Sequence, residues 1–376
     1  MRHLYIHVPF CARRCIYCDF SIAVRKNIPA DRYVKTILRE HEHRVASGQW
    51  EDSPPETLYL GGGTPSLLPS EQIDVLLSHF SKTEGKGGSA LELTLEANPD
   101  DVTPENAAAW AAAGVNRVSL GVQSFDSRVL EWMHRTHEPA QAVAAVRSLV
   151  EAGIESISID LIAALPPELE RDFGSDLSEA IALKPDHVSV YGLTAEPRTA
   201  LYRWIARKAV FPATDKTYAA NFLLADEVLT DAGYEHYEVS NYARPGRRSQ
   251  HNQAYWDGSS YSGLGPSAHG FDGLERRWNV SPWVEYERLV TDAGDATEGR
   301  ELLTPRQAEL ERTYLSLRTS DGMPLEETRK FDPVLLAEAE DHDWGRRVGD
   351  RWCLTPSGWL RLDELVTALT TSTEGA

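Results

Sequence analysis

The sequence predicts an α/β fold, in which a partial (β/α) barrel of about six units is followed by a small α+β module. Two observations carry this prediction. Apolar runs rich in β-branched and aromatic residues alternate with helical patterns through the first 240 of the 376 residues, which is typical of a parallel sheet covered by helices. After residue 240 this alternation stops, and the chain length suggests two or three domains.

The strands of the barrel are expected, in order, at 3–8, 57–60, 91–96, 117–122, 156–162 and 187–193. Helical patterns lie between them, for example at 69–80, 104–113, 139–152, 171–183 and 214–232. Thr103 followed by Pro104 is a typical helix start, since threonine caps a helix and proline fits its first turn. Six such units fit a (β/α) barrel better than a small open sheet, so we expect functional residues at the C-terminal ends of the strands.

The rest of the chain is expected to form a separate module. Residues 241–282 are rich in Gly, Asn, Tyr and Trp and show little periodicity, whereas 304–318 has a helical pattern. A hairpin is expected at 347–354, and a last helix at 356–369 with one apolar face made of Trp359, Leu362, Val366 and Leu369. We therefore divide the chain into a core barrel at 1–240, a Gly- and aromatic-rich region at 241–300, and a winged-helix-like module at 301–376.

Composition excludes several classes of function. The chain has 41% hydrophobic and 25% charged residues and a net charge of 38 − 57 = −19, which argues against broad electrostatic binding to nucleic acid or to an anionic membrane. No run of about 18 apolar residues is free of charge, so no membrane span is expected. The first residues lack the apolar core of a signal peptide, and we expect a cytoplasmic protein.

Three of the four cysteines cluster directly after the first expected strand. Cys11, Cys15 and Cys18 have the spacing C-x3-C-x2-C. Three thiolates can fill three corners of a [4Fe-4S] cluster and leave one iron open for a further ligand. The alternatives are a zinc site, with His7 or Asp19 as fourth ligand, and three unrelated thiols.

With Tyr17 before its third cysteine, this motif resembles that of the radical SAM superfamily. The resemblance implies that the open iron binds S-adenosyl-L-methionine (SAM), and that one electron from the cluster cleaves SAM to a 5′-deoxyadenosyl radical. Gly61-Gly62-Gly63-Thr64-Pro65 follows the second strand, where glycines let the backbone approach a ligand closely. By itself this run could be a tight turn. The resemblance implies that it binds the amino group of SAM.

Polar residues at other strand ends match SAM-contacting residue types in the branch that resembles oxygen-independent coproporphyrinogen III oxidase. A carboxylate can bind a ribose hydroxyl pair, and an arginine can bind a carboxylate. No catalytic residue is identified. The set of residues that the resemblance implies for SAM is Tyr5, Gly62, Gly63, Thr64, Glu96, Gln123, Arg135 and Asp160.

Within this branch the chain resembles HemW-type haem chaperones most. Phe20 stands where the oxidase has a further cysteine, and the oxidase carries a longer N-terminal segment. His251-Asn252-Gln253-Ala254-Tyr255-Trp256 matches the H-N-x-x-Y-W motif associated with haem binding. The resemblance thus implies a haem-binding region at 241–300, with His251, Asn252, Tyr255 and Trp256 as its contacts.

The motif also has a physical rationale. Imidazole is a good axial ligand of haem iron, and Tyr and Trp offer flat faces to a porphyrin. The alternative is a loop histidine beside core aromatics. His269, at the end of Gly263-Leu264-Gly265-Pro266-Ser267-Ala268-His269, is a second candidate ligand.

Two segments depart from the family pattern. The usual Gly-Leu-Pro-Gly-Gln is Ala164-Leu165-Pro166-Pro167-Glu168 here, and the usual Leu-Gly-Arg is Met133-His134-Arg135. These departures concern the geometry of SAM binding that the resemblance implies. The three cysteines match the family motif.

By resemblance, the expected function is to bind haem and transfer it to an acceptor, such as a respiratory haem enzyme, with a reductant protein serving the cluster. Whether SAM is cleaved stays open. The first alternative is oxidative decarboxylation of coproporphyrinogen III to protoporphyrinogen IX. The second is a plain electron-transfer or zinc-stabilised protein.

Overall fold

A computed structural model describes residues 2–81 and 91–371. Its centre is a parallel sheet of six strands, hydrogen-bonded in the order of the chain, and each lies within a residue or two of its predicted position. The six strands are β1 (His3–Val8), β4 (Thr57–Gly62), β5 (Glu92–Ala97), β6 (Arg117–Gln123), β7 (Ser156–Ala163) and β8 (His187–Gly192).

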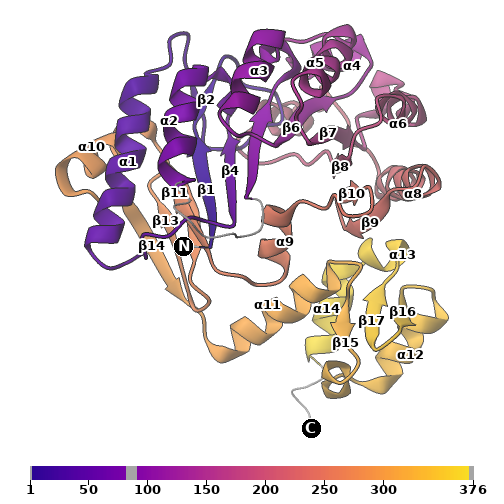
Figure 1. Cartoon of the computed structure of the whole chain (residues 1–376). Helices are drawn as coiled ribbons and strands as arrows, with labels where there is room; N and C mark the ends of the chain where they lie inside the picture. Colours follow the sequence, from indigo (N-terminus) through magenta and orange to yellow (C-terminus); the bar gives the residue numbers. More distant parts are fainter. Residues whose placement is uncertain (1, 82–90, 372–376) are drawn as a thin grey trace.

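Helices cover the outer face of this sheet (Figure 1). They bury apolar side chains against alternating strand residues such as Leu4, Ile6, Leu58 and Leu60, which are fully buried. The predicted cap is confirmed, because the Thr103 side chain accepts a hydrogen bond from the Asn106 backbone N–H. The covering helices are α1 (Ala30–Ala46), α2 (Ser70–Phe80), α3 (Pro104–Ala112), α5 (Pro139–Glu151), α6 (Phe173–Ala182) and α8 (Asp215–Asp231).

The region 241–300 extends the sheet at both ends. β11 (Tyr261–Leu264) pairs parallel to β1, and β12 (His269–Phe271), β13 (Glu275–Asn279) and β14 (Thr297–Leu302) follow antiparallel. At the other end β10 (Asn241–Ala243) and β9 (Glu235–Glu238) pair antiparallel. The outermost strands β14 and β9 do not pair, so the barrel is partial, as predicted. These strands have three to six residues, too few to display a period in the sequence.

Short elements connect the strands of the sheet. β2 (Phe10–Cys11) and β3 (Ala23–Val24) flank the cysteine loop and pair in parallel. The others are η1 (Pro65–Leu67), η2 (Pro99–Asp101), α4 (Ser127–Trp132), η3 (Pro167–Leu169), α7 (Ala200–Ala206), α9 (Gln250–Trp256) and α10 (Trp283–Ala293).

The last part of the chain forms the predicted winged-helix-like module with a core of its own. The predicted hairpin forms the antiparallel strands β16 (Gly345–Val348) and β17 (Arg351–Leu354). The last predicted helix is divided into α13 (Pro356–Trp359) and α14 (Leu362–Thr371), yet Trp359, Leu362, Val366 and Leu369 are buried together as expected. The module also contains α11 (Pro305–Leu317), β15 (Met323–Pro324), η4 (Glu327–Lys330) and α12 (Pro333–Asp341).

The module is fixed to the β9 end of the sheet. Arg318 forms an ion pair of 3.2 Å with the fully buried Glu238, and the Trp359 and His236 rings meet edge to face with centroids 4.5 Å apart. Across residues 2–81 and 91–371, no helix is long and apolar enough to cross a membrane.

Candidate functional site

The cysteine motif lies at the C-terminal end of the parallel strands. Cys11 is buried at the end of β2, while Cys15 and Cys18 are half-buried in the loop that follows, and none of the three forms a disulfide. Thr64 Oγ1 donates to Cys11 Sγ at 3.4 Å, and Arg135 Nη1 donates to Cys15 Sγ at 3.7 Å. Two donors from distant segments therefore point at thiol sulfurs.

Burial changes the pKa of two of the three cysteine thiols. Within the described residues, no group of three or more His, Cys, Asp or Glu side chains converges on one metal position. Burial raises the pKa of Cys11 to about 11 and also raises the pKa of Cys18. These thiols hold their protons until a metal displaces them.

The glycine run packs against the backbone that carries Cys11. Gly62 has φ +113°, and a Cβ there would lie 2.5 Å from the His7 ring. A Cβ on Gly63 would lie 2.7 Å from the Phe10 carbonyl oxygen. The Gly63 and Thr64 N–H groups donate to the Val8 and Phe10 carbonyls, each at 2.8 Å. Glycine is required here because two backbones approach each other, which also brings Thr64 to Cys11.

Glu96 ends β5 and faces the same rim. Its Oε2 accepts from the Gly62 N–H at 2.9 Å and its Oε1 accepts from the Tyr59 hydroxyl at 2.8 Å. Burial raises the pKa of Glu96 to about 7. Tyr5 lies on β1, which β4 separates from β5, and its hydroxyl is 3.1 Å from His7 Nδ1.

Arg135 links the cysteine loop to the ends of β5 and β6. Its Nη2 donates to Asn98 Oδ1 at 2.6 Å and to the Gly121 carbonyl at 2.7 Å, and its buried Nε has no hydrogen-bond partner among the described residues. Asn98 Nδ2 in turn donates to Thr64 Oγ1 at 3.5 Å. Sequence reasoning missed Asn98, although its place just after the third strand was the available signal.

Two further predicted SAM residues lie on β6 and β7, Gln123 at the end of its strand and Asp160 within its strand. Gln123 ends β6 at a bulge and has φ +69°, a conformation that is uncommon for a residue other than glycine. Asp160 accepts hydrogen bonds from Ser119 Oγ at 2.9 and 3.1 Å. Burial raises the pKa of Asp160.

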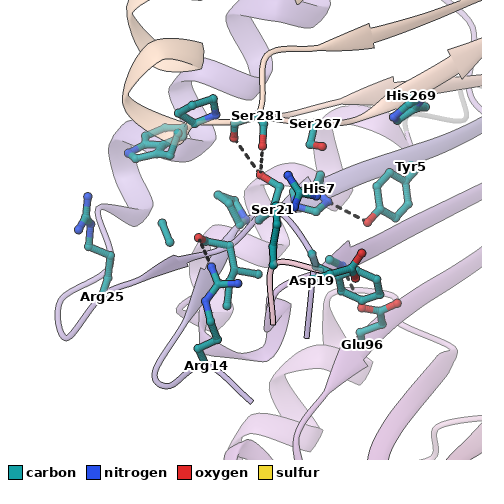
Figure 2. Close-up of a pocket in the computed structure, with 18 of the residues that line it drawn as sticks. Tyr5, His7, Arg14, Asp19, Ser21, Arg25, Glu96, Ser267, His269 and Ser281 are labelled. Atoms are coloured by element: carbon teal, nitrogen blue, oxygen red, sulfur yellow. Dashed lines mark hydrogen bonds between the residues drawn. The ribbon is translucent and has the colours of Figure 1, made fainter. Parts of the chain in front are cut away.

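A cavity of about 1150 Å³ opens between the cysteine loop, strands β11 and β12, and the first residues of α10 (Figure 2). It exceeds the roughly 300–1,000 Å³ that is usual for a site holding one drug-sized ligand. Of the predicted residues, Tyr5, Gly62, Glu96, Tyr255 and His269 line it. Sequence reasoning missed the three arginines in its wall, Arg14, Arg25 and Arg198, because they come from segments far apart in the sequence.

The H-N-x-x-Y-W motif forms helix α9. The alternative interpretation, in which His251 lies in a loop, is therefore wrong. His251 is 1% exposed. Its Nδ1 is 2.7 Å from Thr57 Oγ1, and its Nε2 is 2.9 Å from the Tyr255 hydroxyl. Burial lowers the pKa of His251 to about 3. Thr57 is the first residue of β4, so His251 faces the N-terminal end of the sheet.

The four motif residues divide between two faces of α9. His251 and Tyr255 are four residues apart and share the face toward the sheet. Trp256 points toward the C-terminal module, where the Arg318 guanidinium lies 4.3 Å from its ring centroid. The half-buried Asn252 donates its backbone N–H to Ser249 Oγ at 3.3 Å. Of the four, only Tyr255 lines the cavity.

Comparison with known proteins agrees with this geometry. The radical SAM superfamily profile matches residues 5–180. In fold, the chain matches coproporphyrinogen III oxidase (HemN) from Escherichia coli, a radical SAM enzyme, with a TM-score of 0.80 over 99% of this chain and 90% of that chain, at 22% sequence identity. The partial barrel and its cysteine loop are those of a radical SAM protein.

Sequence relatives narrow the class further. Proteins named haem chaperone HemW are 36% identical in Mycobacterium tuberculosis (strain CDC 1551 / Oshkosh), over 97% of this chain and 94% of the relative, and 33% identical in Bacillus subtilis (strain 168), over 86% and 85%. The relative from Escherichia coli (strain K12) is 39% identical over 71% of this chain and 69% of its own length. The chain belongs to the HemW family.

Proposed function

We propose that this chain is a haem chaperone, which binds haem and passes it to an acceptor protein, and that it carries a [4Fe-4S] cluster and SAM. The observation that carries the proposal is the similarity to proteins named haem chaperone HemW along nearly the whole chain. The cavity of about 1150 Å³ beside the cysteine loop supports it, since a haem and a SAM molecule together need a large site.

In this proposal Cys11, Cys15 and Cys18 hold the cluster. When bound, a cluster with one open iron binds SAM and supplies it with an electron. Arg135 Nη1 donates a hydrogen bond to Cys15 Sγ, and Thr64 Oγ1 donates one to Cys11 Sγ, so both side chains orient a proposed cluster ligand. The proposed SAM contacts are Tyr5, Gly62, Gly63, Thr64, Glu96, Gln123, Arg135 and Asp160.

The proposed haem contacts are the four residues of the H-N-x-x-Y-W motif, namely His251, Asn252, Tyr255 and Trp256. Tyr255 supports this directly, since its ring is part of the cavity wall. The rest of the proposal is a cytoplasmic location, an acceptor such as a respiratory haem enzyme, and a protein reductant for the cluster.

One observation keeps coproporphyrinogen III oxidation as a second candidate, namely the shared fold with HemN at a TM-score of 0.80. A second observation weighs against it. Phe20 lines the cavity with 60% of its surface exposed, at the position where the oxidase resemblance calls for a cysteine. A phenyl ring cannot donate a proton or ligate a metal there.

An anaerobic titration of the cluster-loaded protein with haemin tests the proposal. We expect saturable binding of one haem per chain, followed by transfer to an added apo-haem protein such as apomyoglobin. A parallel incubation with SAM, a reductant and coproporphyrinogen III tests the second candidate. Absence of specific haem binding together with formation of protoporphyrinogen IX would replace the chaperone proposal with the oxidase.

A further inference from the structure

An accessible histidine, His269, lines the cavity. His269 begins β12, at the rim formed by the C-terminal ends of the parallel strands, and its side chain is exposed (Figure 2). Its ring stacks on Trp278, with centroids 5.9 Å apart and an angle of 25° between the planes. Within residues 2–81 and 91–371, neither ring nitrogen of His269 has a hydrogen-bond partner. Burial and the charge of Arg276 lower the pKa of His269, which favours the neutral imidazole that binds a metal.

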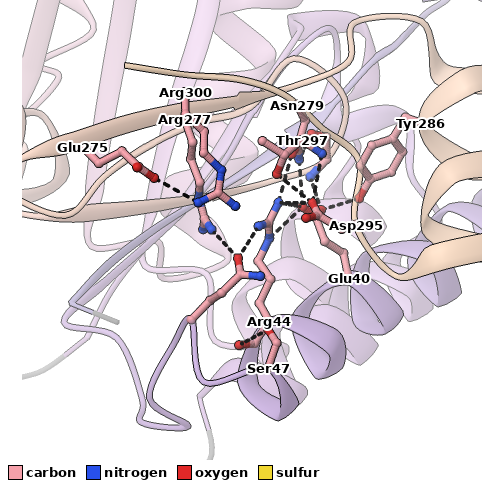
Figure 3. Close-up of polar contacts among 12 residues, drawn as sticks. Glu40, Arg44, Ser47, Glu275, Arg277, Asn279, Tyr286, Asp295, Thr297 and Arg300 are labelled. Atoms are coloured by element: carbon pink, nitrogen blue, oxygen red, sulfur yellow. Dashed lines mark hydrogen bonds and ion pairs between the residues drawn. The ribbon is translucent and has the colours of Figure 1, made fainter. Parts of the chain in front are cut away.

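The segment before His269 is held by a buried polar network (Figure 3). Glu40 of α1 is fully buried, and its Oε2 accepts from the Gly265 N–H at 3.1 Å and from the Tyr286 hydroxyl at 2.6 Å. Asn279 Nδ2 donates both to Glu40 Oε1 at 2.8 Å and to the Gly265 carbonyl at 2.9 Å. Arg44 neutralises the charge of Glu40.

This network fixes the backbone on both sides of His269. The Asn279 N–H donates to the Ala268 carbonyl at 3.0 Å, and a Cβ on Gly263 would lie 2.1 Å from the His269 carbonyl oxygen. A side chain on a fixed backbone presents its ring at a defined position, so ligand binding does not carry the entropic cost of ordering a loop. His269 is therefore exposed but anchored.

The cavity around His269 has the composition that a porphyrin requires. Aromatic rings of Tyr5, Tyr255 and Tyr261 lie in its wall, and flat faces of this kind pack against a macrocycle. Arg25 and Arg198 also line the cavity, and neither forms an ion pair with a described carboxylate. In a chain with a net charge of −19, two unmatched guanidinium groups in one cavity indicate an anionic ligand, and haem carries two propionates.

His251 is much less available for the iron. It is 1% exposed, and both of its ring nitrogens are hydrogen-bonded. To bind iron through Nε2, His251 would have to release the Tyr255 hydroxyl, which loses its hydrogen bond in a buried place. To bind iron through Nδ1, it would have to release the Thr57 hydroxyl, which keeps its contact with His3 Nδ1 at 3.0 Å.

We propose that His269, and not His251, is the axial ligand through which this chain holds haem iron in the cavity, while α9 forms the floor under the macrocycle through Tyr255. This inference rests on the proposed function, since it concerns where the haem of that function binds. His251 is a positioning residue that fixes Tyr255 through their 2.9 Å contact.

The test is a haemin titration of the full, cluster-loaded chain, followed by Soret absorption and by electron paramagnetic resonance of the ferric haem. Four proteins are compared: wild type, His269→Ala, His251→Gln and His342→Ala. His342 is the matched control, because it is also exposed and stacked on a tryptophan, Trp344, with centroids 4.7 Å apart, but lies in the C-terminal module.

We expect His269→Ala to lose the imidazole-ligated spectrum and about tenfold or more of the affinity, which corresponds to loss of a single strong contact. Added imidazole should restore the spectrum, and the other two variants should keep an imidazole ligand. If His269→Ala keeps the wild-type spectrum and affinity, the inference is wrong although the chaperone function stands. If wild type binds no haem, the proposed function itself fails.

Discussion

At the scale of single residues, the four cysteines differ in what surrounds them. Cys11 and Cys15 each receive a hydrogen bond from a side chain of another segment, Thr64 or Arg135. Cys353 is buried among the side chains of the C-terminal module in β17 and behaves as a small hydrophobic residue. Clustering and polar surroundings, and not the thiol itself, separate the candidate ligands from the structural cysteine.

This contrast gives a prediction about metal content. Cys15→Ala should abolish the cluster, because two remaining thiolates cannot hold a cube of four irons. Iron and sulfide analysis after anaerobic purification measures this. Cys353→Ala is the control and should keep the wild-type iron content. Wild-type iron in Cys15→Ala would show that the ligands are assigned wrongly.

The pKa of Glu96 gives a second prediction at this scale. Burial raises this pKa to about 7 from an ordinary value of 4.5. Between these values the folded state binds the proton more tightly than the unfolded state does, so this group makes the free energy of unfolding fall as pH rises. Glu96→Gln removes that effect.

We therefore expect the stability of Glu96→Gln relative to wild type to increase between pH 5 and 8, by up to about 3 kcal/mol. Urea unfolding of the metal-free and SAM-free proteins across this range measures it. A difference between the two proteins that stays constant with pH would contradict the prediction.

At the scale of elements, the departures from the family pattern fall where the backbone favours glycine. His134 follows α4 with φ +60°, and Ala164 follows β7 with φ +55°. They are two of the three positions where the family pattern has glycine, and Pro167 stands at the third. A left-handed residue after a helix is the usual place for glycine, because a Cβ is strained there. This chain carries that strain next to Arg135 and at the end of β7.

Relieving the strain should stabilise the protein. His134→Gly is expected to raise the free energy of unfolding by up to about 1 kcal/mol, since the gain in the folded state exceeds the entropy that glycine adds to the unfolded chain. His342→Gly is the matched control, as His342 ends α12 with φ −92° and should lose stability by about 0.5–1 kcal/mol. Urea unfolding measures both. Equal effects of the two changes would contradict this account.

At the scale of the whole molecule, the sequence predicts the barrel better than the cavity. The six parallel strands are long, apolar and separated by amphipathic helices, so their pattern is visible locally. The cavity combines β1 with α9, β11 and β12, which come more than 200 positions later in the chain. Its arginines come from loops without periodicity. The burial of His251 depends on Thr57, a neighbour that no local pattern reveals.

The C-terminal module contacts the barrel through the ion pair between Arg318 and Glu238. Arg318→Met should lower the free energy of unfolding by about 3 kcal/mol, because it leaves the carboxylate of Glu238 buried without its partner. Arg288→Met, which removes exposed ion pairs with Glu285 and Asp292, should cost much less than this, because water and salt screen an exposed pair. Thermal unfolding measures both. Similar costs would show that the buried pair does not fix the module.

An open barrel has two sheet edges, and each edge is a surface to which a strand of another chain can add. β14 bears the exposed charges of Glu298, Arg300 and Glu301, which oppose such pairing. β9 is covered by the segment after α11, since the Ser320 N–H donates to the Tyr237 carbonyl at 2.9 Å and Thr319 bridges to Glu238. The C-terminal module therefore covers the β9 edge of the sheet. We expect a chain cut before α11 to self-associate through β9.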